Sequence, residues 1–118
     1  MAWAVAVSPE FERWYTDLSE AEQEAIEYSI RLLQELGPAL GRPHADTVYG
    51  SRHSNIKELR AQHSRRAYRM FFAFDPDRVA IMLLGGIKND HGRWYERMIA
   101  SADELYDAHL ARRKSKGR

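Results

Sequence analysis

The feature that most restricts the fold of this chain is a series of three strand-like segments joined by short polar links. The segments are rich in β-branched, aromatic or aliphatic side chains and span residues 56–61, 68–74 and 79–87. The second link, residues 75–78, is Asp-Pro-Asp-Arg, which is typical of a hairpin turn, and the first link is a looser polar connection. The middle of the chain is therefore predicted to form an antiparallel sheet.

Two helices are predicted before these strands and one after them. The Ser8-Pro9 pair has the chemistry of a helix start, and Ser19 with Glu22 forms a capping box that starts a second helix. A short strand at residues 3–7 comes first, and apolar residues at helical spacing after Gly92 predict a C-terminal helix. The order β-α-α-β-β-β-α predicts an α+β domain with a small, mostly antiparallel sheet, a helical hairpin and a C-terminal helix.

A chain of 118 residues is long enough for one domain with a single core. We expect this domain to span residues 1–113, and the basic residues 114–118 to form a disordered tail. Residues 38–55 show no hydrophobic period, and a loop of this length is usually functional or mobile. No apolar run could cross a bilayer and no signal peptide is recognisable, so we expect a cytoplasmic protein without a membrane partner.

Several kinds of site are excluded by what the sequence lacks. It contains no cysteine, which excludes disulfides, thiolate zinc sites and cysteine nucleophiles. Its five histidines occur singly, and it has no serine-hydrolase, phosphate-loop or dinucleotide motif. We therefore expect neither a metal nor a cofactor.

Charge is distributed unevenly along the chain. The formal net charge is −6 for residues 1–37, +5 for residues 38–74 and +2 for residues 75–118. A basic face favours a partner that carries phosphate groups, such as nucleic acid, although uneven surfaces also occur in proteins that bind none.

The first hairpin predicts a pair of arginines on neighbouring strands. If Ala61 lies opposite Tyr68, then Arg60 lies opposite Arg69. Like charges in this position are unfavourable by up to ~1 kcal/mol, so an anion between them would explain the pair. Alternatively, Arg69 pairs diagonally with Glu58.

The second hairpin is predicted to place Phe74 opposite Val79. One face of the sheet would then pack on the first two helices through Leu59, Met70 or Phe72, Ile81 and Leu83. The other face is expected to be partly open, because it carries Glu58, Arg60, Arg69, Phe71 and Ala73. Truncation of Arg69 is therefore expected to cost little stability.

Further candidates surround the arginine pair. Lys88 follows a glycine pair at the end of the third strand, and His63 and His91 lie in loops where each could transfer protons. Trp94 lies off the apolar stripe of the last helix, so stacking on a base and simple packing are both open. Tyr95 lies on that stripe and is expected in the core.

Several motifs together resemble one family. They are Val-Tyr-Gly-Ser-Arg at 48–52, Ile-Lys-Glu-Leu-Arg at 56–60, Tyr-Arg-Met-Phe-Phe-Ala at 68–73, Leu-Gly-Gly-Ile-Lys at 84–88 and Trp-Tyr at 94–95. They resemble the HigB-type, phage-derived branch of the RelE superfamily, and the order of elements agrees over nearly the whole chain. Members of this family are toxins of type II toxin–antitoxin modules, which cleave mRNA, generally on the ribosome.

The resemblance implies a RelE-like fold and a metal-independent endoribonuclease that inhibits translation. Arg69 matches the family's arginine that contacts the scissile phosphate, and Arg60 and Lys88 match positions that are usually basic. We add His91 as a candidate for proton transfer. Contacts with RNA are expected from Arg52, Lys57, Arg65, Arg66 and Trp94. The expected partners are mRNA, the ribosome and a cognate helix-turn-helix antitoxin.

Two other functions remain open on the same residues. One is a non-catalytic regulator that binds RNA or the ribosome through the basic face. The other is a protein-binding partner whose arginines form a structural network.

Overall fold

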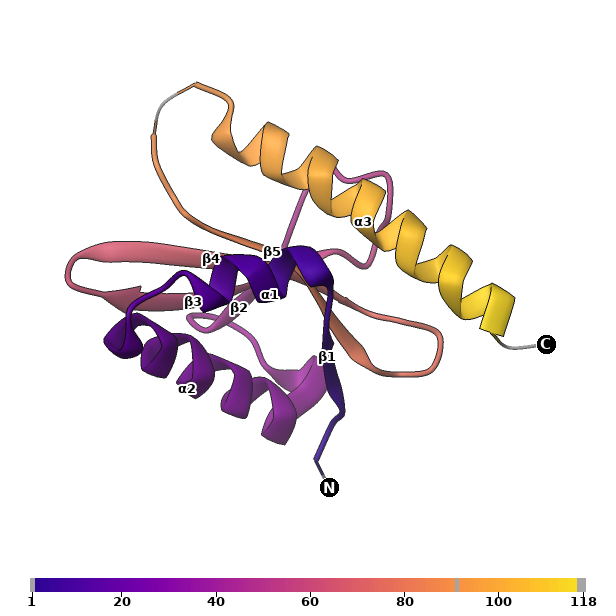
Figure 1. The fold of residues 1–118 in the computed structure, drawn as a ribbon, viewed down its shortest axis with the longest axis horizontal. Coiled ribbons are helices and arrows are strands. Elements are labelled where there is room, and N and C mark those ends of the chain that lie inside the picture. Colours follow the sequence, from indigo (N-terminus) through magenta and orange to yellow (C-terminus); the bar gives the residue numbers. More distant parts are fainter. Residues whose placement is uncertain (1, 91, 117–118) are drawn as a thin grey trace.

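The computed structural model describes residues 2–90 and 92–116 (Figure 1). Its elements are β1 Val5–Val7, α1 Pro9–Thr16, α2 Glu20–Leu36, the 3₁₀ helix η1 Gly37–Ala39, β2 Ala45–Thr47, β3 Lys57–His63, β4 Arg66–Phe74, β5 Ala80–Ile87 and α3 Trp94–Lys116. The predicted order is confirmed, with η1 and β2 added in the segment that was expected to be a loop.

One five-stranded sheet forms the centre of the molecule. Its strands are ordered β1-β5-β4-β3-β2. Only the β1–β5 pair is parallel, and the other three pairs are antiparallel. α2 and α3 lie on opposite sides of this sheet (Figure 1), so both of its faces are covered. No helix in the described part of the chain is long and apolar enough to span a membrane.

Both predicted helix starts are confirmed by their hydrogen bonds. The Ser8 hydroxyl accepts a hydrogen bond from the Phe11 amide at 3.0 Å. In the capping box, the Ser19 amide donates to the Glu22 carboxylate at 2.8 Å, and the Glu22 amide donates to the Ser19 hydroxyl at 3.2 Å. These contacts satisfy amides that a helix start would otherwise leave unpaired.

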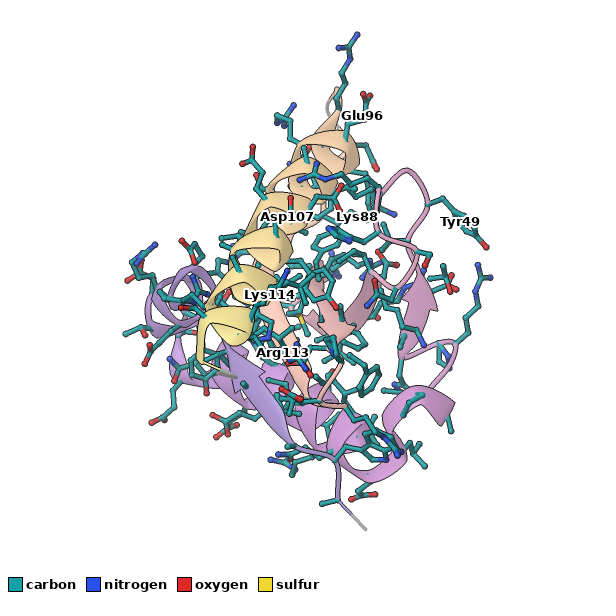
Figure 2. The ribbon with its side chains drawn as sticks, turned by 90° about the vertical axis from the view of Figure 1, so that its right-hand side faces the viewer. Tyr49, Lys88, Glu96, Asp107, Arg113 and Lys114 are labelled. Carbon is teal, nitrogen blue, oxygen red and sulfur yellow. The ribbon has the colours of Figure 1, made fainter. Side chains whose placement is uncertain are left out.

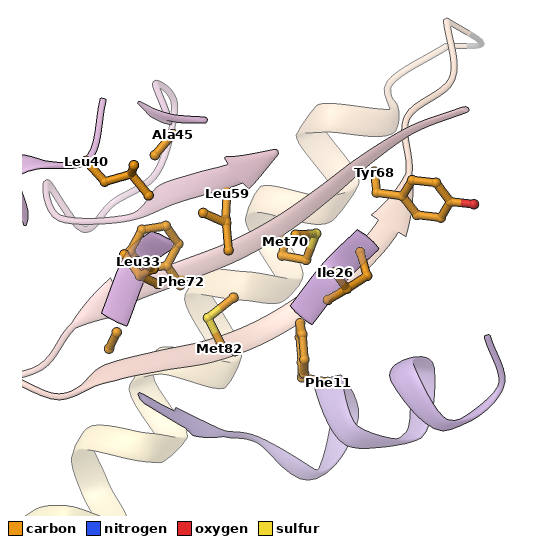
Figure 3. Packing of buried hydrophobic residues seen from close by; sticks show 11 residues of the cluster. Phe11, Ile26, Leu33, Leu40, Ala45, Leu59, Tyr68, Met70, Phe72 and Met82 are labelled. Carbon is orange, nitrogen blue, oxygen red and sulfur yellow. The ribbon is translucent and has the colours of Figure 1, made fainter. Parts of the chain in front are cut away.

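Two apolar layers hold the helices on the sheet. The layer beneath α1 and α2 is shown in Figure 3 and contains Phe11, Ile26, Leu33, Leu40, Ala45, Leu59, Tyr68, Met70, Phe72, Ala80 and Met82. The layer beneath α3 contains Val48, Ile56, Phe71, Ala73, Ile81, Leu83, Trp94, Ile99, Ala102 and Tyr106. The face that we expected to be partly open is therefore closed over much of its area by α3.

The first predicted register is correct and the second is wrong. Arg60 lies opposite Arg69, as predicted, but Phe74 lies opposite Ala80 rather than Val79. Val79 belongs to the turn, where its amide donates to the Asp75 carboxylate at 3.0 Å. The one-residue difference exchanges the faces of β5, so Ile81 and Leu83 pack against α3 and not against the helical hairpin.

A bulge also separates the two halves of the β4–β5 pairing. The register shifts between Phe71 and Phe72, and as a result Arg69 lies opposite Gly86 instead of Leu84.

The C-terminal half of α3 is fastened to the β4–β5 turn. His109 lies 2.8 Å from the buried carboxylate of Asp75, and Arg113 donates two hydrogen bonds to Asp77 at 2.7 and 2.9 Å. The His109 ring also stacks on Tyr106. The helix continues to Lys116, three residues beyond the Arg113 at which we expected order to end, and residues 117–118 lie outside the described part.

The glycine pair on β5 lets both helical layers approach the sheet closely. A Cβ atom on Gly85 would lie 2.3 Å from the Trp14 ring of α1, and one on Gly86 would lie 2.9 Å from the Met98 side chain of α3. Gly85 has no room for a side chain beside the rigid Trp14 ring, whereas a Cβ on Gly86 would meet the flexible end of Met98, so the packing requirement is stricter at Gly85.

We expect Gly85→Ala to lower the free energy of unfolding by about 1–3 kcal/mol, because the new methyl group would overlap the Trp14 ring. Urea denaturation measures the change. Gly41→Ala is the matched control, since a Cβ at that position meets no atom within 4 Å. Equal stability of the two variants would contradict the packing role of Gly85.

Glu22 connects the start of α2 to the sheet. Its carboxylate accepts a hydrogen bond from the Tyr68 hydroxyl and lies 3.8 Å from Arg66. The bond from Tyr68, followed by the bond from the Ser19 amide, lowers the pKa of Glu22 from 4.5 to about 2. A carboxyl with a lowered pKa stabilises the fold above its unfolded pKa and loses this effect as the pH falls through the folded value.

We expect Glu22→Gln to be less stable than the wild-type protein at pH 6, and the difference to shrink between pH 4.5 and about 2. Chemical denaturation at several pH values measures this. Glu24→Gln, an exposed position of the same helix, is the control. A difference that stayed constant over this pH range would show that the ionised carboxylate is not responsible.

Candidate functional site

The predicted arginine pair lies on either side of a buried glutamate. Arg60 on β3 donates through Nε to Glu58 Oε2 at 2.8 Å, and Arg69 Nε on β4 lies 3.7 Å from the same oxygen. Glu58 is only 4% exposed. A buried carboxylate is stable only when it is paired, and here it also offsets the repulsion between the two guanidinium groups. The anion that we expected near the arginines is thus supplied by the chain itself.

Tyr95 of α3 completes the surroundings of this glutamate. Its hydroxyl donates to Glu58 Oε1 at 2.7 Å and accepts a hydrogen bond from Arg69 Nε at 3.2 Å. Burial, and then the hydrogen bond to Glu58, raise the pKa of Tyr95 above its usual value of 10. The phenol therefore stays protonated at neutral pH and acts as a hydrogen-bond donor.

A second carboxylate extends the arrangement to the edge of the sheet. Asp46 on β2 lies opposite Glu58, and its Oδ2 atom is 3.5 Å from Arg60 and 2.7 Å from Arg42. The hydrogen bond from Arg42 lowers the pKa of Asp46. We call the whole set the arginine–carboxylate network; its members are Arg42, Asp46, Glu58, Arg60, Arg69 and Tyr95.

Two hollows reach the network from the outside. The larger, about 550 Å³, is lined by Tyr28 and Ser29 of α2 together with Arg60 and Arg69. The smaller, about 300 Å³, lies beside Arg60 and Tyr95 on the other side. The Arg60 side chain is 29% exposed and that of Arg69 is 12% exposed. A bound anion would therefore reach Arg60 more easily than Arg69.

Of the other two proposed catalytic residues, the structure describes Lys88, which lies further along the sheet. Lys88 is exposed just beyond the end of β5, where its amide donates to the Ala67 carbonyl at 2.7 Å. It lines a third hollow, about 310 Å³, together with Trp94 and Tyr95. His91 lies outside the described residues. Within residues 2–90 and 92–116, no three or more histidine or carboxylate side chains are grouped so that they could hold a metal ion.

The residues expected to contact RNA are spread over several surfaces. Arg65 and Arg66 are exposed at the β3–β4 turn, between Gln62 and Ala67, which line the larger hollow. Lys57 alternates with Glu58 and so belongs to the opposite face of β3. Arg52 forms an ion pair with Asp107 of α3.

Trp94 is 8% exposed and packs against Phe71. Of the two alternatives open for this ring, the structure shows packing against Phe71, and Trp94 also lines the hollow beside Lys88.

Sequence reasoning placed the arginines together, and its alternative that Arg69 pairs diagonally with Glu58 is confirmed at 3.7 Å. It missed three members of the network: Arg42 and Asp46, which lie in the segment without any period, and Tyr95, which was assigned to the core. The available signal for Glu58 was the Glu-x-Arg spacing, because residues two apart on a strand share a face.

The architecture agrees with that of known RelE structures. A mutant of the E. coli toxin RelE in the free state, with two arginines changed to alanine, aligns over 95% of this chain and 98% of its own, with a TM-score of 0.57 and 15% identity. The intact E. coli RelBE toxin–antitoxin complex gives a TM-score of 0.58 over 75% of this chain and 99% of the matched chain, at 11% identity. These likenesses define a protein with the RelE fold.

The sequence comparisons place the chain in a family. Residues 13–107 match the family described as phage-derived protein Gp49-like (DUF891), and the chain belongs to this family. It is 42% identical to HigB3 of Mycobacterium tuberculosis (strain ATCC 25618 / H37Rv) over 92% of its length and 94% of that protein. It is 48% identical to HigB2 of the same strain over 83% of its length, but the match spans only 50% of HigB2. Both relatives are named as toxins, and the resemblance to the HigB-type branch is confirmed.

We expect Arg69→Ala to lower the free energy of unfolding by about 1–3 kcal/mol, because Glu58 and the Tyr95 hydroxyl both lose a buried partner. This replaces the expectation of a small cost, which assumed an open face. Urea denaturation measures the change, with Arg112→Ala on the exposed side of α3 as the control. If Arg69→Ala were as stable as the control, the guanidinium would not be needed to hold Glu58.

Proposed function

We propose that this protein is the toxin of a toxin–antitoxin pair and that it cleaves mRNA without a metal ion. The observation that carries the proposal is the fixed pair of guanidinium groups, Arg60 and Arg69, on the walls of the hollow of about 550 Å³. Guanidinium groups suit a phosphodiester, because their planar donors bind two oxygens at once and remain charged. Membership of the Gp49-like family and the similarity to HigB2 and HigB3 support the same class.

In this mechanism the substrate supplies its own nucleophile. The ribose 2′-oxygen attacks the adjacent phosphorus, a proton leaves the 2′-hydroxyl, and the bond to the 5′-oxygen of the next nucleotide breaks as that oxygen gains a proton. The products carry a 2′,3′-cyclic phosphate and a 5′-hydroxyl. Arg60 and Arg69 stabilise the charge that develops on the phosphorane oxygens. Lys88 and His91 are the candidates for moving the two protons.

The proposed partners follow from this chemistry. The substrate is mRNA, held on the ribosome, so the protein acts in the cytoplasm. Arg65 and Arg66, exposed beside the same hollow, contact the RNA backbone, and Arg52 and Lys57 add charge further away. The antitoxin, for which we propose a helix-turn-helix protein, inhibits by placing its own groups over the arginine pair.

A second function is favoured by one specific observation. Glu58 already neutralises the arginine pair at 2.8 and 3.7 Å. If RNA phosphate does not replace any of these contacts, the basic face would serve only for binding, and the protein would be a non-catalytic regulator of RNA or ribosomes.

We expect Arg60→Ala to reduce the rate of mRNA cleavage by about 100-fold or more, the usual effect of removing one donor to a developing oxyanion. The measurement maps new mRNA 5′ ends with purified translating ribosomes, and Arg112→Ala is the control. Arg60 is a better position than Arg69 for this test because its side chain is more exposed. RNA binding without new 5′ ends in the wild-type protein would favour the regulator.

The same assay on free RNA tests the proposed independence of metal ions. Activity should persist in EDTA, because the described residues offer no cluster of metal ligands. Loss of cleavage in EDTA with rescue by magnesium would overturn this part of the proposal.

A further inference from the structure

Tyr49 is the most exposed large apolar side chain in the described part of the protein. It is 83% exposed, compared with 54% for Tyr28 and 48% for Leu36. Figure 2 shows its ring pointing away from the body of the molecule. Single exposed apolar side chains are common on protein surfaces, so the surroundings of the ring, rather than its exposure, must indicate any role.

The loop that carries Tyr49 is held firmly at both sides of the residue. Val48, immediately before it, is buried, and its amide donates to the Ile56 carbonyl at 3.2 Å. Three residues after Tyr49 form hydrogen bonds with α3; they are Ser51, Arg52 and His53. The exposed ring is therefore presented from an ordered segment.

The partners of these hydrogen bonds are two aspartates of α3. The Ser51 hydroxyl and the Arg52 amide both donate to Asp103, which is 4% exposed. The Arg52 guanidinium pairs with Asp107, which also lies 2.7 Å from the His53 ring. The hydrogen bonds from Arg52 and His53 lower the pKa of Asp107, so the pairing is retained at neutral pH. This explains why Arg52, proposed above as an RNA contact, points to α3.

Tyr49 is one of the residues that line the smaller hollow beside the arginine–carboxylate network. The same hollow is lined by Arg42, Arg60 and Tyr95. Arg42 is 74% exposed, so a cation that solvent can reach lies on the same wall. An exposed aromatic ring that shares a hollow with the exposed guanidinium group of Arg42 matches the two parts of a nucleotide, since the base stacks and the phosphate pairs with the cation.

We infer that Tyr49 stacks on a base of single-stranded RNA whose phosphate is bound by Arg42 at the smaller hollow, with Arg60 connecting this hollow to the phosphodiester site in the larger one, and that the ring contributes to the choice of the cleavage position. This rests on the proposed function. A nucleobase is favoured over a protein segment because the ring is isolated. In the described part of the chain, the other exposed large apolar side chains lie on β1, α2 and β5, so they do not extend it into an apolar patch on its own loop; they are Val7, Tyr28, Leu36 and Ile87.

The test uses single-stranded 2′-O-methyl oligonucleotides, which bind but lack the attacking hydroxyl, with 2-aminopurine placed at each position in turn. With the wild-type protein, we expect quenching of the fluorescence at one position, as stacking requires. Tyr49→Ala should lose that quenching and bind about tenfold more weakly, whereas Tyr49→Phe and Tyr49→Trp should retain both. Leu36→Ala is the control for loss of an exposed apolar side chain.

Salt dependence separates stacking from charge. Tyr49→Ala removes no charge, so the slope of log K against log salt should be unchanged, whereas Arg42→Ala should reduce it by about 0.7 for one lost phosphate contact. The exposed ring contributes little to folding, so thermal unfolding of Tyr49→Ala should match that of Leu36→Ala.

The outcomes distinguish a failure of the stacking inference from a failure of the proposed function. If the wild-type protein binds no RNA, the proposed function fails and the inference fails with it. If the wild-type protein binds and Tyr49→Ala binds equally well with unchanged quenching, only the inference is overturned, and the ring is left for a protein contact. If the slope falls in Tyr49→Ala, the effect is electrostatic and stacking is again excluded.

Discussion

The buried carboxylate of Glu58 is the interaction on which the rest of this structure depends. Without it, two guanidinium groups on adjacent strands would repel one another inside a region that α3 covers. With it, the central sheet can carry charge beneath a helix, because each arginine has a partner and the Tyr95 hydroxyl occupies the second carboxylate oxygen. The contacts of Glu58 also connect β3, β4 and α3. The same side chains therefore form the candidate site and stabilise the fold. Replacing residues of the site therefore also changes packing.

Much of the fold could be predicted because local signals dominate it. Ser8, Ser19 and Glu22 mark the helix starts through hydrogen bonds that span three residues, and the first hairpin sets the register of Arg60 and Arg69. The second register failed because the turn contains one more residue than its composition suggests, with Val79 bonded to Asp75. That difference, together with the bulge after Phe71, depends on contacts that become visible only in three dimensions.

The candidate site was predicted less completely, for a related reason. The two arginines lie on the two strands of one hairpin, so the position of the turn between them is enough to predict that they are neighbours. Asp46 and Tyr95 reach them from a short edge strand and from the last helix, and no periodic pattern marks such long-range meetings. The family resemblance supplied the class of protein and the strand register offered Glu58 as a partner of Arg69, while the contacts of Asp46 and of the Tyr95 hydroxyl came only from the structure.

The glycine pair on β5 has a consequence for how this lineage can diverge. Trp14 and Met98 press on Gly85 and Gly86 from opposite faces of a single strand. A descendant that exchanged Trp14 for a smaller residue would open space at Gly85 and tolerate a side chain there, whereas the reverse order of substitutions would pass through a clash. Such paired positions should therefore change together, and in one preferred order. Substitutions that alter the packing of the helical hairpin or of the C-terminal helix on the sheet therefore depend on two neighbouring residues of β5.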